Sequence, residues 1–188
     1  MHNASNMELT LGTLKIVPAH ERADLMAPSV ASAIGGVDGI GVTEINPELS
    51  DTAAFCEYYK IGMHQAANCV VLEAKRGDRV WYAACVILGS TRADVNGLAR
   101  KTLDARKVSF APMEKAVELT GMEYGAITPV GLPIDWPILV DKAVADSEYV
   151  IIGSGIRKSK LAVPGNFFAA LPNVQILEGL GRAKSETE

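Results

Sequence analysis

The sequence predicts a small α+β protein built on a mixed β-sheet. Two adjoining apolar runs, 67–74 and 79–88, are separated by a short polar segment with Gly77-Asp78, which is typical of an antiparallel hairpin. Around this pair, strand-like and helix-like segments interleave irregularly, whereas a doubly wound parallel sheet requires regular alternation. The 188 residues suit one domain over 1–188, without a linker or an internal repeat.

Glycines and capping residues mark the elements before the hairpin. Small apolar residues at helical spacing end at Gly35-Gly36, and Ser50-Asp51 precedes a run that it can cap as a helix. Residues 1–6 are polar and expected to be frayed, and residues 11–17 fit either an early strand or a loop. We therefore expect, in order, a helix over 27–34, a strand over 42–45 and a helix over 52–59.

After the hairpin, helices and short strands continue to interleave. Asp94 opens a helix that runs through Lys101, and a helix that begins after Pro112 stops at Gly121. The expected elements are, in order, a helix over 94–101, a strand over 107–110, a helix over 113–119, strands over 138–140 and 149–152 with a helical turn over 142–145 between them, an extended segment over 160–163, a short helix over 167–171 and a strand over 174–177.

Composition favours a packed cytoplasmic protein that has no general nucleic-acid-binding surface. Hydrophobic residues make up 48% and charged residues 21%, which argues against disorder, and the net charge of −4 leaves only a local basic patch to grip a nucleic acid. Cys56, Cys69 and Cys85 are odd in number and form no CxxC pair, which favours free thiols in a reducing compartment. Because neither a signal peptide nor a bilayer-spanning run is visible, we expect no membrane among the partners. The acidic net charge leads us to expect no DNA among them.

Several catalytic motifs are absent from the sequence. It contains no Gly-x-Ser-x-Gly elbow, no phosphate-binding loop that ends in Gly-Lys-Ser/Thr and no dinucleotide fingerprint after a strand. His2, His20 and His64 form no zinc-type cluster with the cysteines, so we expect neither a metal nor a cofactor. His64 precedes a strand in a polar turn, where a solvated histidine is favoured over a catalytic base.

Two glycine-rich turns are the candidate sites. The first, Gly125 to Pro129, is either an ordinary turn or a source of backbone groups that orient a water or an ester carbonyl. The second, Gly153-Ser154-Gly155, leaves a buried strand, so its backbone could approach a ligand closely. Three cations follow it directly and form either a solvated edge or a phosphate-binding cluster: Arg157, Lys158 and Lys160.

A series of motifs follows the hairpin in a fixed order. A basic helix over 95–103 is followed by Thr120-Gly121, then by a Gly-x-x-x-Pro motif at Gly125 and Pro129, and finally by Gly153-Ser154-Gly155 at the end of an apolar strand. Taken together with the paired strands, these motifs resemble the YbaK/ProX family in order and spacing. The resemblance covers residues 66–179, more than half of the chain.

This resemblance implies a twisted mixed sheet, partly barrel-like, surrounded by helices. It also implies hydrolysis of the ester that joins a wrong amino acid to the 3′ end of a tRNA, in particular a small amino acid on the tRNA for proline. Such an enzyme would use no metal, no cofactor and no covalent nucleophile, because a positioned water and a stabilised oxyanion suffice for an activated ester. The implied partners are the aminoacylated acceptor end of tRNA and, as a candidate, prolyl-tRNA synthetase.

The resemblance also implies which residues form the site. Catalytic roles fall to Asn68, Gly125 and Thr128, and the family places a lysine where this chain has Asn68. Asparagine keeps the capacity to form hydrogen bonds but loses the positive charge, so this residue is either a site residue or a cap at the start of its strand. The implied substrate-binding residues are Pro129, Gly153, Ser154, Gly155, Arg157, Lys158 and Lys160.

Two further functions stay open at the level of sequence. A non-catalytic module could use the same pocket to bind an aminoacyl-tRNA or a synthetase, and a hydrolase could act on small aminoacyl esters unrelated to tRNA. The loss of a cation at Asn68 favours these two functions. The retained Gly-x-x-x-Pro and Gly-Ser-Gly turns favour a deacylase that acts on mischarged tRNA in trans.

Overall fold

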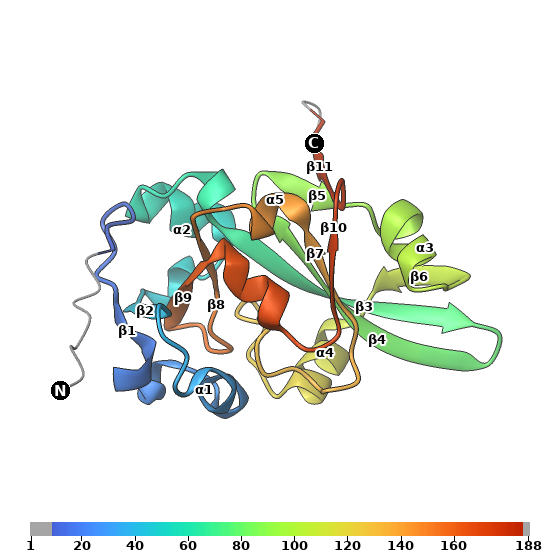
Figure 1. Ribbon diagram of the computed structural model, residues 1–188, viewed down its shortest axis with the longest axis horizontal. Helices are drawn as coiled ribbons and strands as arrows, with labels where there is room; N and C mark the ends of the chain where they lie inside the picture. The colour runs from blue at the N-terminus through green and yellow to red at the C-terminus, as the bar shows by residue number, and fades with distance from the viewer. Residues whose placement is uncertain (1–8, 186–188) are drawn as a thin grey trace.

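The predicted hairpin lies at the centre of the larger sheet of the protein (Figure 1). The computed structural model describes residues 9–185, so the expectation for residues 1–6 falls outside the described part of the chain. Strands β3 (Ala67–Arg76) and β4 (Arg79–Leu88) pair antiparallel along their whole length, and Gly77 takes the positive φ of 58° that the connecting turn requires. This confirms the antiparallel pair.

Three more strands complete a mixed five-stranded sheet in the order β10-β7-β4-β3-β6. Strand β6 (Lys107–Phe110) pairs antiparallel with β3, whereas β7 (Ile138–Asp141) runs parallel to β4 and β10 (Val174–Leu177) runs parallel to β7. The sheet therefore combines hairpin and crossover connections, as the irregular order of predicted elements indicated.

A second sheet of four strands lies beside the first, in the order β1-β2-β9-β8. One parallel bridge, between Ala66 and Ile151, joins the two sheets. A separate two-stranded ribbon pairs β5 with β11, which the sequence did not predict. The strands of these two smaller sheets are β1 (Val17–Pro18), β2 (Gly41–Glu44), β8 (Tyr149–Gly153), β9 (Ser159–Pro164), β5 (Thr91–Ala93) and β11 (Gly181–Ala183).

The helices are short and begin and end at the residues that the sequence marks. Asp51 caps α2, because its carboxylate accepts hydrogen bonds from the backbone N–H groups of Ala53 and Ala54 at 3.1 and 3.2 Å. Helix α4 ends at Gly121, which has a φ of 67°. The α-helices are α1 (Pro28–Ile34), α2 (Thr52–Tyr59), α3 (Arg100–Thr102), α4 (Met113–Thr120) and α5 (Lys142–Ala145).

Two expected elements differ in detail from the prediction. The segment that Asp94 opens is a π-helical turn, Val95–Ala99, which continues into α3. The short helix near the C-terminus is a 3-10 helix, Gly165–Ala170. Of the two alternatives for segment 11–17, the structure shows mostly loop. The other 3-10 helices are Ala19–Glu21, Ala23–Leu25, Pro47–Leu49 and Met63–Gln65.

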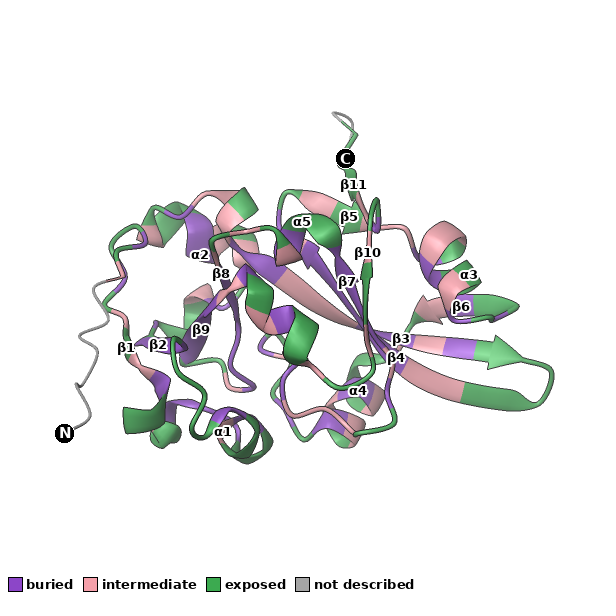
Figure 2. Ribbon diagram, viewed as in Figure 1, coloured by how far each residue is buried: buried purple, intermediate pink, exposed green. Residues whose placement is uncertain are grey.

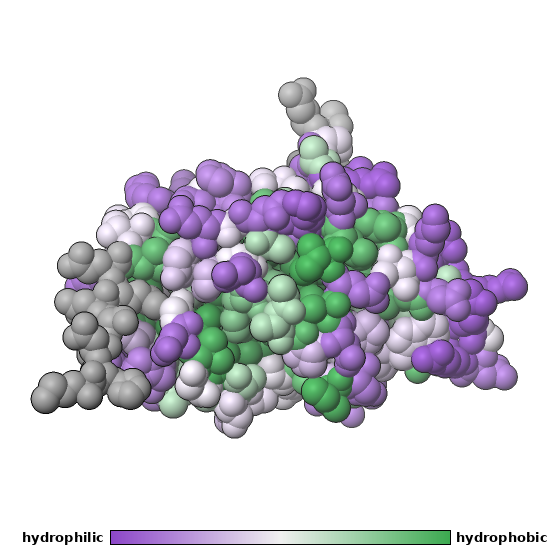
Figure 3. All heavy atoms as spheres, in the orientation of Figure 1, coloured by the Kyte–Doolittle hydropathy of each residue, from purple (hydrophilic) through white to green (hydrophobic). Residues whose placement is uncertain are grey.

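One apolar cluster connects the two main sheets. It contains Val42, Val150 and Leu161 from the smaller sheet and Val86 and Ile138 from the larger one, and all five are almost completely buried. Figure 2 shows the same distribution, with buried residues along the centres of the strands and an exposed tip on the β3–β4 hairpin. Hydrophilic residues dominate the end of the molecule that carries this tip (Figure 3). Burial between the sheets therefore fixes how they sit relative to each other.

Leu139, on β7, is completely buried in the second apolar cluster on the other side of the larger sheet. We expect Leu139→Ala to lower the free energy of unfolding by roughly 2–5 kcal/mol, because it removes buried methyl groups and leaves a cavity. Val80→Ala is the matched control, since Val80 is 49% exposed near the hairpin tip and should change stability by less than about 0.5 kcal/mol. Urea titrations of both variants test the assignment, and similar losses in both would contradict it.

Candidate functional site

A cavity of about 490 Å³ lies between the first turn of α2, the start of β3 and the two glycine turns. Three residues that the sequence assigned to the site, Asn68, Gly125 and Gly153, come together in its wall although they are far apart in the chain. The lining residues are Ser50, Asp51, Thr52, Ala67, Asn68, Cys69, Val70, Val71, Phe110, Ala111, Ala116, Tyr124, Gly125, Ile127, Gly153, Arg157 and Lys160.

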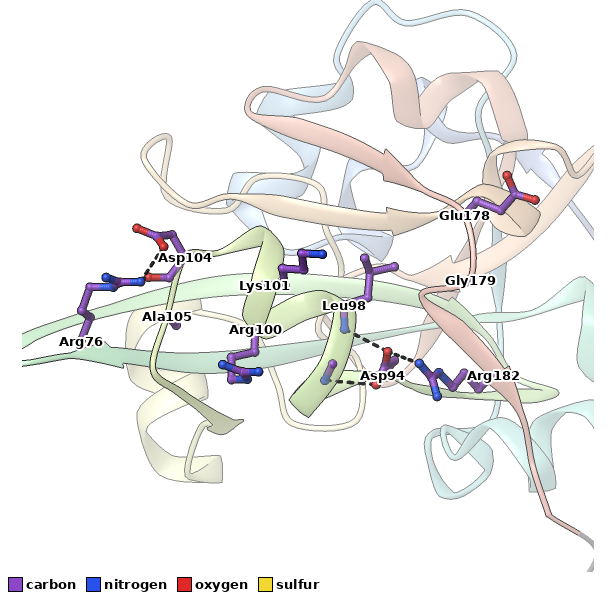
Figure 4. A pocket seen from close by; sticks show the side chains of 11 residues that line it. Arg76, Asp94, Leu98, Arg100, Lys101, Asp104, Ala105, Glu178, Gly179 and Arg182 are labelled. Atoms are coloured by element: carbon purple, nitrogen blue, oxygen red, sulfur yellow. Dashed lines mark hydrogen bonds and ion pairs between the residues drawn. The ribbon is translucent and has the colours of Figure 1, made fainter.

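A larger recess of about 790 Å³ lies elsewhere, between the hairpin, α3 and β11 (Figure 4). Four of its charged side chains form two ion pairs: Arg76 bonds to Asp104 at 2.5 Å, and Arg182 bonds to Asp94 at 2.6 Å. None of the residues that the sequence assigned to the site lines this recess. We therefore take the smaller cavity as the candidate functional site.

Direct backbone contact holds the two glycine turns together. The Gly155 N–H donates to the Ala126 carbonyl oxygen at 2.8 Å, and a Cβ built on Gly153 would lie 2.5 Å from that same oxygen. Residue 153 must therefore lack a side chain for the turns to meet. Gly125 lines the cavity with a φ of 86°, a conformation that L-residues with side chains rarely adopt.

Four residues assigned to the site lie behind its wall instead of in it. Thr128, Pro129, Ser154 and Gly155 are buried and do not line the cavity. The Ser154 hydroxyl bonds to the Ser159 hydroxyl at 2.7 Å, so it holds the turn in place. Thr128, for which we expected a catalytic role, has a fully buried side chain that does not line the cavity.

The three cations after the second turn do not form one exposed cluster. Arg157 lines the cavity, and its guanidinium donates to the Pro47 carbonyl oxygen at 3.1 Å, whereas Lys158 is exposed and lies outside the lining. Lys160, on β9, is only 7% exposed. The three cations therefore do not form the single phosphate-binding cluster that we considered. Arg157 lies at the cavity, Lys158 lies outside it and Lys160 lies in its wall.

Asn68 is oriented by a residue that the sequence analysis did not single out. Its Oδ1 accepts a hydrogen bond from the Thr52 hydroxyl at 2.5 Å, which ties the start of β3 to the first residue of α2. Since that oxygen is occupied, the amide N–H₂ is the group that Asn68 can offer to a ligand. The only signal for Thr52 in the sequence was its place after the helix cap Ser50-Asp51.

Lys160 carries a buried amine at the cavity wall. Its Nζ donates to the Ser50 carbonyl oxygen at 3.0 Å and lies 5.4 Å from the centre of the Phe55 ring. Burial lowers the pKa of Lys160 to about 8, and the charges of Cys56 and Asp51 only partly oppose this shift. Within residues 9–185, no carboxylate lies within ion-pair distance of it.

Neither the cysteines nor His64 offers an activated group to the cavity. All three cysteines are free, and only Cys69 lines the cavity, where burial raises the pKa of its thiol and so keeps it protonated and weakly nucleophilic. His64 is exposed in the turn Met63–Gln65, as expected. Among the described residues, no group of three or more His, Cys, Asp or Glu is placed to hold a metal ion.

Two exposed aromatic side chains stand at the cavity, and the sequence analysis missed both. Phe110 is 61% exposed and Tyr124 is 57% exposed, and both line the cavity. Both rings belong to the few aromatic residues of the chain, which make up 6% of its sequence. Their flat faces provide surfaces on which a planar ligand group could stack.

Comparisons with known proteins identify a family for this chain. The family model described as "Aminoacyl-tRNA editing domain" matches residues 46–170, a range that includes the described cavity wall from Ser50 to Lys160. No significant sequence match appears among curated proteins.

Solved structures show the same fold. A structure described as a candidate trans-editing enzyme for prolyl-tRNA synthetase superimposes with a TM-score of 0.70 at 20% identity, covering 84% of this chain and 99% of its own. The hypothetical protein APE2540 superimposes with a TM-score of 0.66 at 18% identity, covering 75% and 90%. In the part of the chain that the structure describes, no helix has the length and apolar character needed to cross a membrane.

The low pKa of Lys160 makes a prediction about stability. Between about pH 8 and pH 10.5 the folded protein has released this proton while the unfolded chain still holds it, so wild-type stability should rise with pH in this range. The rise should be at most about 3 kcal/mol. In Lys160→Met this contribution should be missing, whereas Lys158→Met, at an exposed lysine, should keep it. Urea titrations across this pH range test it, and parallel curves for wild type and Lys160→Met would contradict it.

Proposed function

Because the chain belongs to the aminoacyl-tRNA editing domain family, we propose that it hydrolyses the ester between a wrong amino acid and the 3′ end of a tRNA, as a separate trans-editing deacylase. The observation that carries this proposal is the cavity in which Asn68, Gly125 and Gly153 meet beside Lys160. Asn68 and Lys160 supply hydrogen-bond donors to this space, and among its described lining residues the one thiol, Cys69, is kept protonated by burial.

The chemistry suits attack by water. An aminoacyl ester is already activated, so orientation of the ester and stabilisation of its developing oxyanion account for most of the required catalysis. The edge of β3 supplies backbone groups for this task. Strand β6 covers β3 only from Leu72 to Lys75, and the Val71 carbonyl accepts from Ala111 N–H at 2.9 Å. Cys69, two residues earlier, directs its backbone groups to the same edge, where the cavity begins.

We propose a small amino acid, such as alanine, as the part of the substrate that the protein selects. The walls near β3 and α4 carry small or medium apolar side chains, namely Ala67, Val71, Ala111 and Ala116. Such a pocket excludes larger side chains by steric overlap. The fold shared with the candidate trans-editing enzyme for prolyl-tRNA synthetase supports the tRNA for proline as carrier and that synthetase as partner.

We also propose that residues 1–188 act as one domain in the cytoplasm. The apolar cluster that both main sheets share supports the first part, and an aminoacyl-tRNA substrate supports the second.

Deacylation of a panel of mischarged tRNAs tests the proposed function. We expect faster release of alanine from the tRNA for proline than in the absence of protein, with little action on the same tRNA carrying proline. The correctly charged tRNA is the control for specificity. A protein that binds the mischarged tRNA but releases no amino acid from any member of the panel would instead be a non-catalytic binding module.

The exposed rings at the cavity suit the unpaired 3′ end of a tRNA, because nucleobases stack on aromatic side chains. Each stacked base contributes about 1–3 kcal/mol, so we expect Phe110→Ala or Tyr124→Ala to raise KM by about tenfold with a smaller effect on kcat. Tyr58→Ala is the control, since Tyr58 is 63% exposed but does not line the cavity. Steady-state kinetics check this expectation, and unchanged KM values in both cavity variants would show that the rings do not hold the substrate.

A further inference from the structure

The burial of Lys160 calls for a functional explanation. Lysine is almost never buried without a carboxylate partner, because removing an ammonium ion from water costs folding free energy. Lys160 is 7% exposed, and within residues 9–185 no carboxylate pairs with it. The Ser50 carbonyl accepts one of its three N–H groups. A methionine or leucine would fill the same space without this cost, so packing alone does not account for a lysine at this position.

Contacts from β8 and from the start of α2 hold Lys160 of β9 in the cavity wall. In the β8–β9 pair, Lys160 lies directly across from Gly153, the glycine that packs on the first turn. The Ser50 carbonyl accepts a hydrogen bond from Lys160, and the Thr52 hydroxyl donates one to Asn68. Two residues at the start of α2, two positions apart, therefore hold the two polar groups. A ligand in the cavity beside Gly125 and Gly153 therefore lies near both the neutral amide of Asn68 and the cation of Lys160.

The charges around Lys160 leave it available to a ligand. Asp51 and Cys56 act on it from α2, but the Asp51 carboxylate accepts the two capping N–H groups of its own helix. Cys69, across the cavity on β3, stays a neutral thiol. Arg157 lines the same cavity and adds a second positive charge. The site thus has a net attraction for an oxygen that carries negative charge.

We propose that Lys160 is the oxyanion-stabilising residue of this site and that its ammonium group donates to the carbonyl oxygen of the bound aminoacyl ester. This inference rests on the proposed deacylase function. The water oxygen attacks the carbonyl carbon, negative charge builds on the carbonyl oxygen beside Lys160, and the bond from that carbon to the ribose oxygen then breaks. One water proton goes to the ribose oxygen and the other leaves with the amino acid, so Lys160 keeps its own proton throughout.

Single-turnover deacylation of alanyl-tRNA for proline by the full chain tests this role. A hydrogen bond to a charged group contributes about 1.5–3 kcal/mol, so we expect Lys160→Met to slow the chemical step by roughly 10- to 100-fold with KM nearly unchanged. Lys15→Met is the control, because Lys15 is an exposed lysine that neither lines the cavity nor belongs to the assigned site, and it should keep the wild-type rate.

The pH dependence of the deacylation rate distinguishes an effect of the Lys160 charge from a purely structural effect of its side chain. After subtraction of the uncatalysed rate, wild-type activity should fall as the pH rises above about 8, because Lys160 then loses its proton. Lys160→Arg should extend the active range to higher pH, since arginine stays protonated. A profile that is the same in wild type and Lys160→Arg would overturn the proposal.

The outcomes distinguish this inference from the function on which it rests. If wild type hydrolyses no aminoacyl-tRNA, the proposed function itself fails. If wild type is active and a folded Lys160→Met keeps its rate, only the role of Lys160 fails. Should Lys160→Met not fold, Lys160→Gln replaces it, and a wild-type rate in that variant would equally overturn the role.

Discussion

The backbone contact between the two glycine turns is the constraint on which the site depends. Gly155 donates to the Ala126 carbonyl, and Gly153 lies so close to that oxygen that a Cβ would meet it at 2.5 Å. The end of β8 can therefore reach the turn at 125–127 only because residue 153 has no side chain. Since Gly153 faces Lys160 across the β8–β9 pair, the same contact also fixes the lysine beside the turn.

The first turn of α2 organises the polar groups on the opposite side of the cavity. Ser50 and Thr52 bind Lys160 and Asn68, while Asp51 satisfies the free N–H groups of the helix. Ser50 and Thr52 thus hold β9, which carries the buried cation, and the start of β3, which carries the neutral amide. The unpaired buried charge opposes folding, which is common where a site is prepared for its ligand in advance. Although this chain has Asn68 where the family resemblance implies a lysine, Lys160 still gives the cavity a positive charge.

Local signals predicted most of the fold, and they predicted less of the site. The hairpin and the ends of α2 and α4 follow from apolar runs, a cap and glycines, whereas the β5–β11 ribbon joins short segments far apart in the chain, which no local pattern reveals. The close approach of Gly153 was predictable from residue type. The burial of Lys160 and the exposure of Lys158 were not predictable, because Lys158 precedes β9 whereas Lys160 lies within it, and two residues at this spacing would share one face of a continuous strand. Likewise, sequence could not show that Thr128 faces the interior.

The central claim is that an aminoacyl ester binds between the two glycine turns and Lys160. A crystal structure with a non-hydrolysable, amide-linked analogue of 3′-aminoacyl-adenosine tests it most directly. The account predicts that the aminoacyl group occupies the cavity of about 490 Å³, with its carbonyl oxygen within hydrogen-bond distance of the Lys160 Nζ. The analogue bound instead in the recess beside Arg100 and Lys101, or a cavity that stays empty at saturating analogue, would contradict it.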